Sequence, residues 1–357
     1  MLNKIAQELK LLFNNKDNIE DLKDCGGSVY ALFQKAVDVQ SLEQANALVD
    51  YSQEKILSFH YDHLPVCWRR LLIDAGLVKA MIQLSTEIPL KSVLWDLDVC
   101  HVVSGSPLRY ELTMKILNEL QSHMTHSPRG LIPRRRQWQD LELNFPVERL
   151  EEQPSFEWFL MHTNRPMIFP SGRWPAHERW RSLDYLLDLG SDRMVPVEIG
   201  SSYTDASWRQ EMMRLEDFVD RCLLGDEMGY LAQHDLLEQI PQLGKDILVP
   251  DYCYLHLELN EYYERRPHEV IKNAWLGPAG TVSPLHHDPF HNLLVQVAGS
   301  KYIRLYDPHQ SVYPREGIMN NTSQVDIENP NLQEFPEFEK TQYVECILTE
   351  GDILYIP

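Results

Sequence analysis

The sequence predicts an α+β protein, in which a helical N-terminal half precedes a β-rich half of the jelly-roll kind. Apolar residues recur at helical spacing up to about residue 125, and from about residue 156 short β-type segments separated by turn residues dominate. The chain has 357 residues, of which 43% are hydrophobic and 24% are charged. That is the composition of a folded globular protein with room for two domains.

The helical half opens with an amphipathic segment and a capping signal. Ile5, Leu9 and Phe13 fall on one face of the expected first helix. Ser41, followed three positions later by Gln44, has the form of a capping box that starts another helix.

Two further helices are expected in this half. The segment VCWRRLLIDAGLVKAMIQL can place Leu71, Val78 and Met81 on one face. A later helix is expected to start at Ser106 and Pro107, because serine is a good N-cap and proline suits the first helical position. We see no arrangement of catalytic residues here, so we expect this half to pack or to bind a partner.

Prolines mark the connection between the halves. Residues 126–155 contain four prolines and a run of three arginines at 134–136. The sequence therefore predicts a helical domain at 1–125, a linker at 126–155 and a β-rich domain at 156–357. The linker is expected to be either a long crossover or partly mobile.

The β-rich domain is expected to begin with mixed structure. WFLMHTNRPMIF indicates a helix end and a short strand, and MVPVEIG indicates another strand. Ser182 can cap the helix LDYLLDLG. Thr204 or Asp205 can cap a helix that runs from about Trp208 to Phe218.

Strand signals dominate the rest of the chain. The strand-like segments are WLG, TVSPLHHD, NLLVQVAG, KYIRLYDP, YVECILTE and DILYIP. AGSK lies between two of them and predicts a hairpin. Many short strands after a few helices favour a small barrel or a two-sheet sandwich.

Charge and cysteine content exclude several classes of protein. The formal net charge of −20 repels phosphate backbones and favours a basic partner, such as a Lys/Arg-rich peptide. The six cysteines form no CxxC pair, which argues against a zinc finger or a disulfide scaffold and for reduced thiols in an intracellular protein. No signal peptide or transmembrane run is visible, so a nuclear or cytoplasmic location is expected.

The strongest chemical signal is the tripeptide His286-His287-Asp288. In a strand, residues i and i+2 share a face, so His286 and Asp288 can offer an imidazole and a carboxylate to one metal ion while His287 points away. This is two-thirds of the 2-His-1-carboxylate triad that binds non-haem Fe(II). Such spacing also arises by chance, and a hydrogen-bonded histidine near a strand end is the alternative.

Lys301 stands out on the next strand. Strand alternation puts it on the same face as Ile303 and Leu305, where a charge is costly unless an anion meets it. A dicarboxylate co-substrate would supply that anion, and a lysine whose ammonium group reaches water is the alternative. Arg304 falls on the opposite face and is expected to be a solvated cation.

The strand half also resembles a known family. The stretch AWLGPAGTVSPLHHDPFHNLLVQVAGSKYIRLYDP is similar to the core of JmjC-domain 2-oxoglutarate oxygenases, in the branch of protein arginyl hydroxylases also described as lysine demethylases. VPVEIGSSYTD, GYLAQHDLLEQIPQL, VPDYC, NNTSQVDIENP and GDILYIP resemble the same branch in the same order. The resemblance covers roughly residues 150–357, extends more weakly to the helical half, and implies a double-stranded β-helix of the cupin type.

The resemblance implies roles for nine residues. It makes His286 and Asp288 two of the iron ligands, and Lys301 the partner of the distal carboxylate of 2-oxoglutarate. The residues that it implies for hydrogen bonds to the co-substrate are Tyr230, Ser283 and Asn292. The residues that it implies for the substrate pocket are Glu198, Gln233 and Trp275. Taken singly, each could instead be a packing residue, a cap or a solvated charge.

The family pattern is incomplete in this sequence. In the family, a strand like GDILYIP leads within a few residues to a tryptophan and then to the histidine that is the third ligand, whereas this sequence stops at Pro357. His291 and His309 are the nearest alternatives, and neither matches the pattern. We therefore expect a chain without its last strands and third iron ligand, either a fragment or a truncated, inactive form.

The resemblance implies an Fe(II)- and 2-oxoglutarate-dependent protein oxygenase that uses O2 to hydroxylate arginine or to demethylate N-methyl side chains. A carboxylate at Glu198 suits a guanidinium, because the two groups can pair through two hydrogen bonds. The expected partner is thus a basic peptide or protein, with no nucleic acid and no membrane. The alternatives are a non-catalytic cupin-like protein that binds a peptide and a metallohydrolase, which would usually show a further cluster such as HxHxD.

Overall fold

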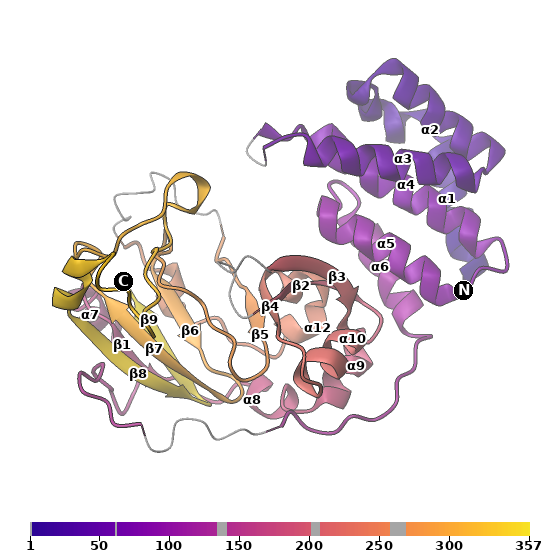
Figure 1. Cartoon of the computed structure of the whole chain (residues 1–357). Helices are drawn as coiled ribbons and strands as arrows, with labels where there is room; N and C mark the ends of the chain where they lie inside the picture. The colour runs from indigo at the N-terminus through magenta and orange to yellow at the C-terminus, as the bar shows by residue number, and fades with distance from the viewer. Residues whose placement is uncertain (1, 61–62, 134–140, 201–207, 258–268) are drawn as a thin grey trace. The chain divides into compact units, whose positions relative to one another are not determined.

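The computed structural model describes every residue except 1, 61–62, 134–140, 201–207 and 258–268 (Figure 1). Contacts divide the chain into two compact units. The first, called the helical unit here, comprises Met1–Ser127, Leu187–Pro196 and Met212–Phe218. The second, called the β-rich unit, comprises Pro128–Leu186, Val197–Glu211 and Val219–Pro357. The domain boundaries expected from the sequence stay a prediction.

The helical unit is arranged around one central helix, α4. In chain order its main helices are α1 (Leu2–Asn14), the 3-10 helix η1 (Lys16–Cys25), α2 (Gly27–Val39), α3 (Leu42–Leu57), α4 (Val66–Leu84), α5 (Leu90–Ser104) and α6 (Tyr110–Gln121). The sequence pattern predicts one buried face on α4, but the helix is buried on all sides, because α1, α3 and α5 all pack against it.

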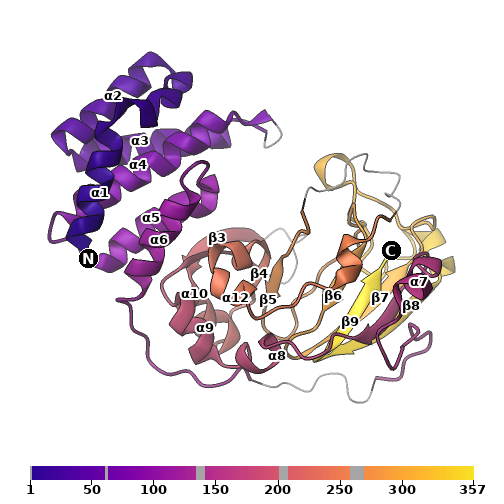
Figure 2. The same ribbon diagram turned by 180° about the vertical axis from the view of Figure 1, so that it is seen from behind.

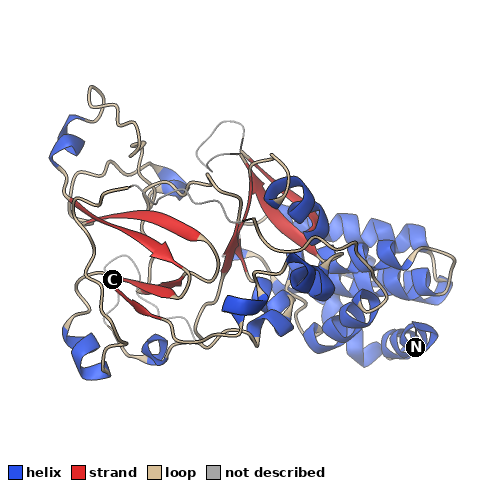
Figure 3. Ribbon diagram, turned by 90° about the horizontal axis from the view of Figure 1, so that it is seen from below, coloured by secondary structure: helices blue, strands red, loops and turns tan. Residues whose placement is uncertain are grey.

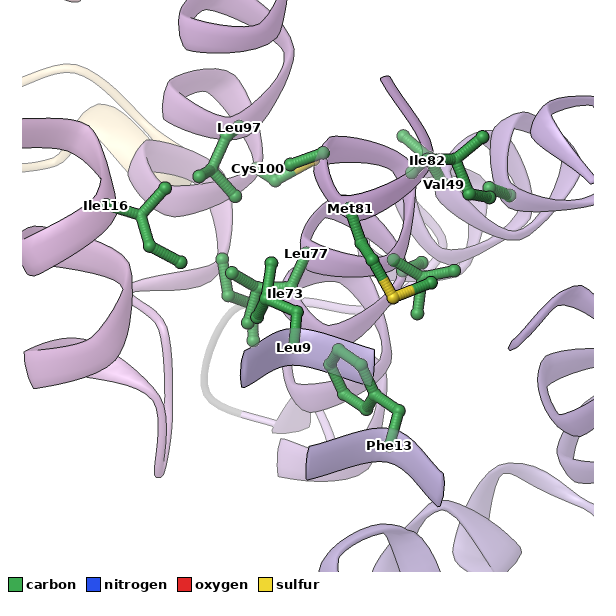
Figure 4. Close-up of a cluster of buried hydrophobic side chains, with 14 of the residues drawn as sticks. Leu9, Phe13, Val49, Ile73, Leu77, Met81, Ile82, Leu97, Cys100 and Ile116 are labelled. Atoms are coloured by element: carbon green, nitrogen blue, oxygen red, sulfur yellow. The ribbon is translucent and has the colours of Figure 1, made fainter. Parts of the chain in front are cut away.

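In the core of this unit, α1 and α5 pack against α4. Leu9 and Phe13 of α1 belong to the same buried cluster as Leu77 and Met81 of α4 (Figure 4). On another side of α4, Gly76 lets α5 approach closely, since a Cβ at this position would come within 2.8 Å of the Cys100 sulfur. The capping prediction at Ser41 is confirmed, because its Oγ accepts the Gln44 N–H at 3.3 Å.

The predicted helix start at Ser106 and Pro107 is wrong. The helix α6 begins at Tyr110, and both Ser106 and Leu108 have left-handed backbone angles, with φ of 48° and 61°. The Ser106 hydroxyl forms a hydrogen bond with His101 Nδ1 at 2.7 Å instead of capping α6. The chain therefore makes a tight turn before the helix starts.

The next part of the chain alternates helices and strands, as predicted. The elements are α7 (Phe156–Met161), β1 (Met167–Pro170), α8 (Ala176–Arg179), α9 (Leu183–Gly190), β2 (Met194–Ile199), β3 (Arg209–Arg214), α10 (Leu215–Phe218) and a short π-helix (Val219–Leu223). Ser182 does cap α9, because its Oγ accepts the Tyr185 N–H at 3.2 Å. The predicted helix from Trp208 is mostly wrong, because β3 joins the sheet beside β2. Thr204 and Asp205 lie outside the described residues.

The remaining strands form three antiparallel arrangements, which confirms the α+β class. These strands are β4 (Gly229–His234), β5 (Ala274–Leu276), β6 (Asn292–Val295), β7 (Ser300–Tyr306), β8 (Tyr343–Thr349) and β9 (Asp352–Ile356). The strand orders are β3-β2-β4-β5, β1-β9-β6 and β7-β8, so β9 lies between β1 and β6. Figure 2 shows β6, β7, β8 and β9 from behind. Short helical turns in the connections are Leu236–Gln239, Pro241–Gly244, Asp251–Tyr254, Gly317–Met319 and Pro336–Lys340.

The β1-β9-β6 sheet packs on the β7-β8 sheet through an apolar layer. Ile168 of β1 and Leu354 of β9 share a cluster with Cys346 and Leu348 of β8. The strands are drawn in red in Figure 3. The hairpin predicted at AGSK is therefore wrong, because β6 pairs with β9 whereas β7 pairs with β8. This layered pairing agrees with the two-sheet sandwich that the strand pattern favours.

Two local predictions on these strands also fail. TVSPLHHD is a loop with a single bridge, between His286 and Thr322, and Pro284 has no N–H to donate to a ladder. Arg304 is not a solvated cation, because its Nε donates to the Tyr302 hydroxyl at 2.7 Å and its guanidinium lies 4.8 Å from the Tyr343 ring centre. In the part of the chain that the structure describes, no helix is long and apolar enough to cross a membrane.

Candidate functional site

Two neighbouring strands of the β-rich unit carry the first part of the site. β2 and β4 run antiparallel with Glu198 opposite Tyr230. Along β2 the burial alternates, so that Val197 and Ile199 are buried while Glu198 is half-buried on the other face. The strand period therefore turns the Glu198 carboxylate away from the apolar core.

Tyr230 connects the strands of the site. Its hydroxyl accepts a hydrogen bond from Lys301 Nζ at 3.0 Å, and the same ammonium lies 5.2 Å from the Tyr230 ring centre. Trp275 of β5 lies beside it, with ring centres 5.7 Å apart. Gly277 allows this packing, because a Cβ there would come within 2.7 Å of the Tyr230 ring. Lys301 of β7 is thus held toward β4 and β5.

Gln233 sits at an irregularity in β4. Its backbone has a left-handed φ of 52°, and the pairing of β4 with β5 changes register between Leu231 and His234. Such bulges re-aim a side chain, and here Gln233 lines the same hollow as Glu198. Next to the bulge, His234 Nε2 donates to the buried Gln239 Oε1 at 2.7 Å, which fixes the end of the strand.

His286 and Asp288 face each other across a loop. His286 Nδ1 donates to the Pro284 carbonyl at 2.7 Å, so a neutral imidazole keeps its lone pair on Nε2. Nε2 lies 4.0 Å from Asp288 Oδ1, so bonds of about 2 Å to one ion would place the two atoms on opposite sides of it. The two side chains would therefore have to move closer together to occupy adjacent positions on an ion. Asn292 Nδ2 donates to the other Asp288 oxygen at 3.5 Å. An oriented imidazole beside a carboxylate is a donor pair that fits Fe(II).

The described residues contain no group of three or more His, Cys, Asp and Glu side chains placed to hold a metal ion. Of the alternative ligands considered from the sequence, His291 forms a hydrogen bond through Nδ1 with the Tyr355 hydroxyl at 2.7 Å. The donor set that the described residues supply is therefore His286 with Asp288.

A hollow joins these parts. Its lining consists of Glu198, Gly200, Trp208, Tyr230, Gln233, Trp275, Thr281, Val282, Ser283 and His286. Six of the nine residues that the resemblance implies are in this lining. The other three adjoin it, since Lys301 contacts Tyr230, Asp288 faces His286 and Asn292 contacts Asp288. The structure thus brings all nine together, while their roles stay predictions.

The electrostatics of the hollow favour a cation next to Glu198. Burial raises the pKa of the Glu198 carboxyl, and a hydrogen bond with the Trp208 side chain opposes this rise. Among the described residues, neither Glu198 nor Lys301 takes part in an ion pair. One carboxylate and one ammonium thus stand in the same site, each able to meet a ligand of opposite charge.

Comparison with known proteins places the chain in a family. A model of the cupin-like domain matches residues 153–357. Lysine-specific demethylase 8 of Danio rerio is 34% identical over 378 residues, which cover 99% of this chain and 91% of that protein. The chain belongs to the cupin-like JmjC family. Jumonji C domain-containing protein 5 of Drosophila melanogaster is 33% identical over 332 residues, covering 87% of this chain and 80% of that protein.

Another JmjC relative is more similar over a shorter stretch. Lysine-specific demethylase JMJ30 of Arabidopsis thaliana is 45% identical over 209 residues, covering 56% of this chain and 46% of that protein. The family resemblance and the fold class predicted from the sequence are therefore confirmed. JmjC proteins of this kind are 2-oxoglutarate-dependent oxidoreductases that generally use Fe(II).

Sequence reasoning missed four residues that line the hollow, namely Gly200, Thr281, Val282 and Trp208. The most informative of the four is Trp208. It lines the hollow, forms the hydrogen bond with Glu198 and is 38% exposed, so its ring is available to a ligand. The sequence places Trp208 at the start of an expected helix, which hides its role. The proximity of Trp208 to Glu198 depends on the pairing of β2 with β3. The only signal in the sequence is that a tryptophan directly precedes the mostly polar segment 209–214.

Proposed function

We propose that this JmjC protein hydroxylates arginine side chains of a basic peptide or protein in a reaction that depends on Fe(II), 2-oxoglutarate and O2. One observation carries the proposal. The Glu198 carboxylate lines the same hollow as His286, together with the exposed side chains of Trp208 and Trp275. A cationic side chain bound there would lie next to the metal-binding pair.

The chemistry of Glu198 favours a guanidinium over an N-methylated ammonium group. A carboxylate offers two oxygens that match the parallel N–H groups of arginine, whereas methylation removes N–H donors from lysine. The rings of Trp208 and Trp275 can stack on the planar guanidinium and exclude water from the pair. Glu198 and the two tryptophans would thus bind and orient the substrate, and demethylation is the alternative outcome.

His286 and Asp288 would hold the metal, which when bound supplies oxidation of a substrate C–H bond coupled to decarboxylation of 2-oxoglutarate. Lys301 would bind the far carboxylate of this co-substrate, because its ammonium is already held in the site by Tyr230. The hydrogen bond from His286 to Pro284 keeps the Nε2 lone pair directed at the metal position. Asn292 would orient Asp288 in the same way.

A second candidate function is peptide binding without catalysis. Three residues of the hollow favour it, because Glu198, Trp208 and Trp275 need no metal to bind a guanidinium. The two functions share the same substrate chemistry and differ only in turnover.

One experiment separates them. The chain is mixed anaerobically with Fe(II) and 2-oxoglutarate, with and without imidazole as an external nitrogen donor, and the visible charge-transfer band is recorded. Air and an arginine-containing peptide are then added, and succinate and a peptide mass gain of one oxygen atom are measured. The oxygenase proposal expects the band, succinate and the mass gain.

The Glu198→Gln variant is the matched control. It should retain the band but lose at least tenfold in peptide affinity, since a hydrogen bond to a charged group contributes about 1.5–3 kcal/mol. Peptide binding without succinate, with and without imidazole, would overturn the oxygenase proposal and support the binding protein. Oxidation of N-methyl-lysine but not of arginine would overturn the substrate assignment.

A further inference from the structure

Two aromatic rings meet on the surface of the helical unit, beside the connection from α3 to α4. The rings of Tyr51 and Trp68 pack edge to face, with centres 5.8 Å apart and planes at 76°. Tyr51 belongs to α3 and is 39% exposed, whereas Trp68 lies in the first turn of α4 and is half-buried against the helical core. This pair, called the aromatic corner here, thus rests on packed structure and is accessible to a ligand.

The chain already places a cation of its own in the aromatic corner. Lys55 lies one turn after Tyr51 on α3, so the two side chains share a face of the helix. Its Nζ is 5.4 Å from the Tyr51 ring centre and 5.6 Å from the Trp68 ring centre. Both distances are within the ~6 Å over which an aromatic face attracts a cation. Because no described carboxylate pairs with Lys55, the two rings are the partners that the structure gives its ammonium group.

Exposed acidic residues adjoin the aromatic corner. Asp50 and Glu54 directly precede Tyr51 and Lys55 on α3, and they lie one turn apart on an exposed stripe of the helix. Neither of these carboxylates pairs with a cation among the residues that the structure describes. The whole chain also has a formal net charge of −20. The charges around the corner therefore favour a basic partner.

We propose that the aromatic corner binds an N-trimethylated lysine side chain of a basic peptide, which displaces Lys55. An unmethylated lysine would only exchange one ammonium group for another, and Lys55 has the advantage of its tether to α3. A quaternary ammonium has no N–H groups that need water, whereas the displaced Lys55 regains hydrogen bonds with water. An arginine, with its five N–H donors, is better matched by a carboxylate than by two rings. The exchange thus favours the methylated side chain.

Lys55 is an internal competitor in this arrangement. Its ammonium group holds the position that the ligand needs, so removing its charge should strengthen binding. A residue that only supported the fold would have the opposite effect when it is replaced. The aromatic corner includes none of the residues of the hollow, so the inference does not rest on the function proposed for the β-rich unit.

Nuclear magnetic resonance of the full chain tests the inference. The eight tryptophans are labelled with 15N, and the indole N–H signal of Trp68 is assigned from its loss in the Trp68→Phe variant. The probe is a peptide of alanine, glycine and arginine around one trimethyl-lysine. We expect this peptide to shift the Trp68 signal until the site is saturated. Copies with unmethylated lysine, or with a neutral side chain that has carbon in place of the charged nitrogen, should bind about 2- to 30-fold more weakly.

Three variants make the result specific. Tyr51→Leu keeps an apolar side chain but removes one ring, so it should weaken binding of the trimethyl-lysine peptide by about 2- to 30-fold. Lys55→Gln frees the aromatic corner and should strengthen binding by a similar factor. Lys10→Gln is the matched control, because it removes the same charge from an exposed lysine of α1 and should leave the affinity nearly unchanged.

Three results would overturn the inference. The first is equal affinity for the trimethyl-lysine peptide and its neutral copy. The second is a Lys55→Gln variant that binds the peptide no more tightly than the unmodified chain. The third is a shift of the Trp208 and Trp275 signals, assigned in the same way, without a shift of Trp68, because this would place the peptide in the hollow. The comparison of peptides uses the unmodified chain, so a variant that fails to fold does not remove the test.

Discussion

Asp74 in the helical unit and Glu198 in the β-rich unit are both carboxylates withdrawn from water, and their surroundings differ in one respect. Asp74 is inaccessible to solvent and accepts hydrogen bonds from Arg70 and Arg109, both at 3.0 Å. Arg70 is itself almost fully buried and also pairs with Asp21. Glu198 is half-buried, and its described partner is the side chain of Trp208.

The difference shows how one physical effect serves two purposes. Burial raises the pKa of both carboxyls, to about 6 at Asp74, where Arg109 and Arg70 oppose the rise. At Asp74 the chain supplies its own guanidinium groups, so the cluster is complete and joins η1, α4 and the segment before α6. At Glu198 the opposing charge has to come from outside. A carboxylate paired within the chain builds structure, whereas one left beside a hollow recognises a ligand.

The largest expected effect is on the complete cluster. Asp74→Ala should lower the free energy of unfolding of the helical unit by about 3–5 kcal/mol, because it leaves the buried guanidinium of Arg70 without its main partner. Denaturant unfolding followed by circular dichroism measures this. Glu198→Ala, the matched change in the other region, should cost less than about 1 kcal/mol. Equal losses of unfolding free energy in the Asp74→Ala and Glu198→Ala variants would contradict the distinction between the two carboxylates.

The second effect concerns the other charge of the hollow. Lys301→Ala should raise the 2-oxoglutarate requirement by roughly 10- to 100-fold, since charged hydrogen bonds contribute about 1.5–3 kcal/mol. The Fe(II) requirement should stay the same, because Lys301 contacts Tyr230 rather than His286 or Asp288. Titration of the charge-transfer band with each component checks this. An unchanged 2-oxoglutarate requirement would remove Lys301 from its proposed role.

The third prediction uses the raised pKa of Glu198. Only the ionised carboxylate attracts a guanidinium, so affinity for an arginine peptide should be full above the raised pKa and should fall as the pH drops through it, by up to about tenfold per unit. The fall should begin above the ordinary glutamate value of 4.5. Quenching of tryptophan fluorescence reports the affinity. Glu198→Gln should bind weakly and without this pH dependence, and an identical profile in the variant would contradict the assignment.

The smallest expected effect is indirect. Gln239→Leu removes the acceptor for His234 beside the bulge, which should loosen Gln233 and raise the KM for peptide a few-fold while leaving the 2-oxoglutarate requirement unchanged. Gln242→Leu is the control, because the buried Gln242 Oε1 has no hydrogen-bond partner among the described residues. If both variants raise the KM equally, the bulge has no special role.

Periodicity predicted the elements that are decided locally. The pattern VCWRRLLIDAGLVKAMIQL coincides with α4, and the segments around Lys301 and Leu354 are strands as expected. The cap at Ser106 failed because its hydroxyl has a competing partner in His101, which a sequence does not show. Likewise, the predicted helix at residues 209–214 gave way to pairing with β2, a contact between segments.

Prediction of the site was also limited by contacts that the sequence does not show. Strand alternation predicts that His286 and Asp288 share one face, yet they face each other within a loop. The spacing of His286 and Asp288 correctly indicated that the two side chains lie close together, but the assumption that they lie on a strand was wrong. The contact between Tyr230 and Lys301 joins residues from different sheets, so only the family resemblance placed them together. Neither strand spacing nor the family resemblance indicated Trp208.

The position of β9 between β1 and β6 has a consequence for the order of events during synthesis. Asn292, which contacts Asp288, is held in register by pairing with Ile356. The proposed metal-binding pair therefore cannot acquire this support on the ribosome until residues 352–356 have emerged. The Asp74 cluster needs nothing beyond Arg109. We expect nascent chains to bury the helical charges early, while the hollow beside Glu198 and His286 forms completely only after translation has passed β9.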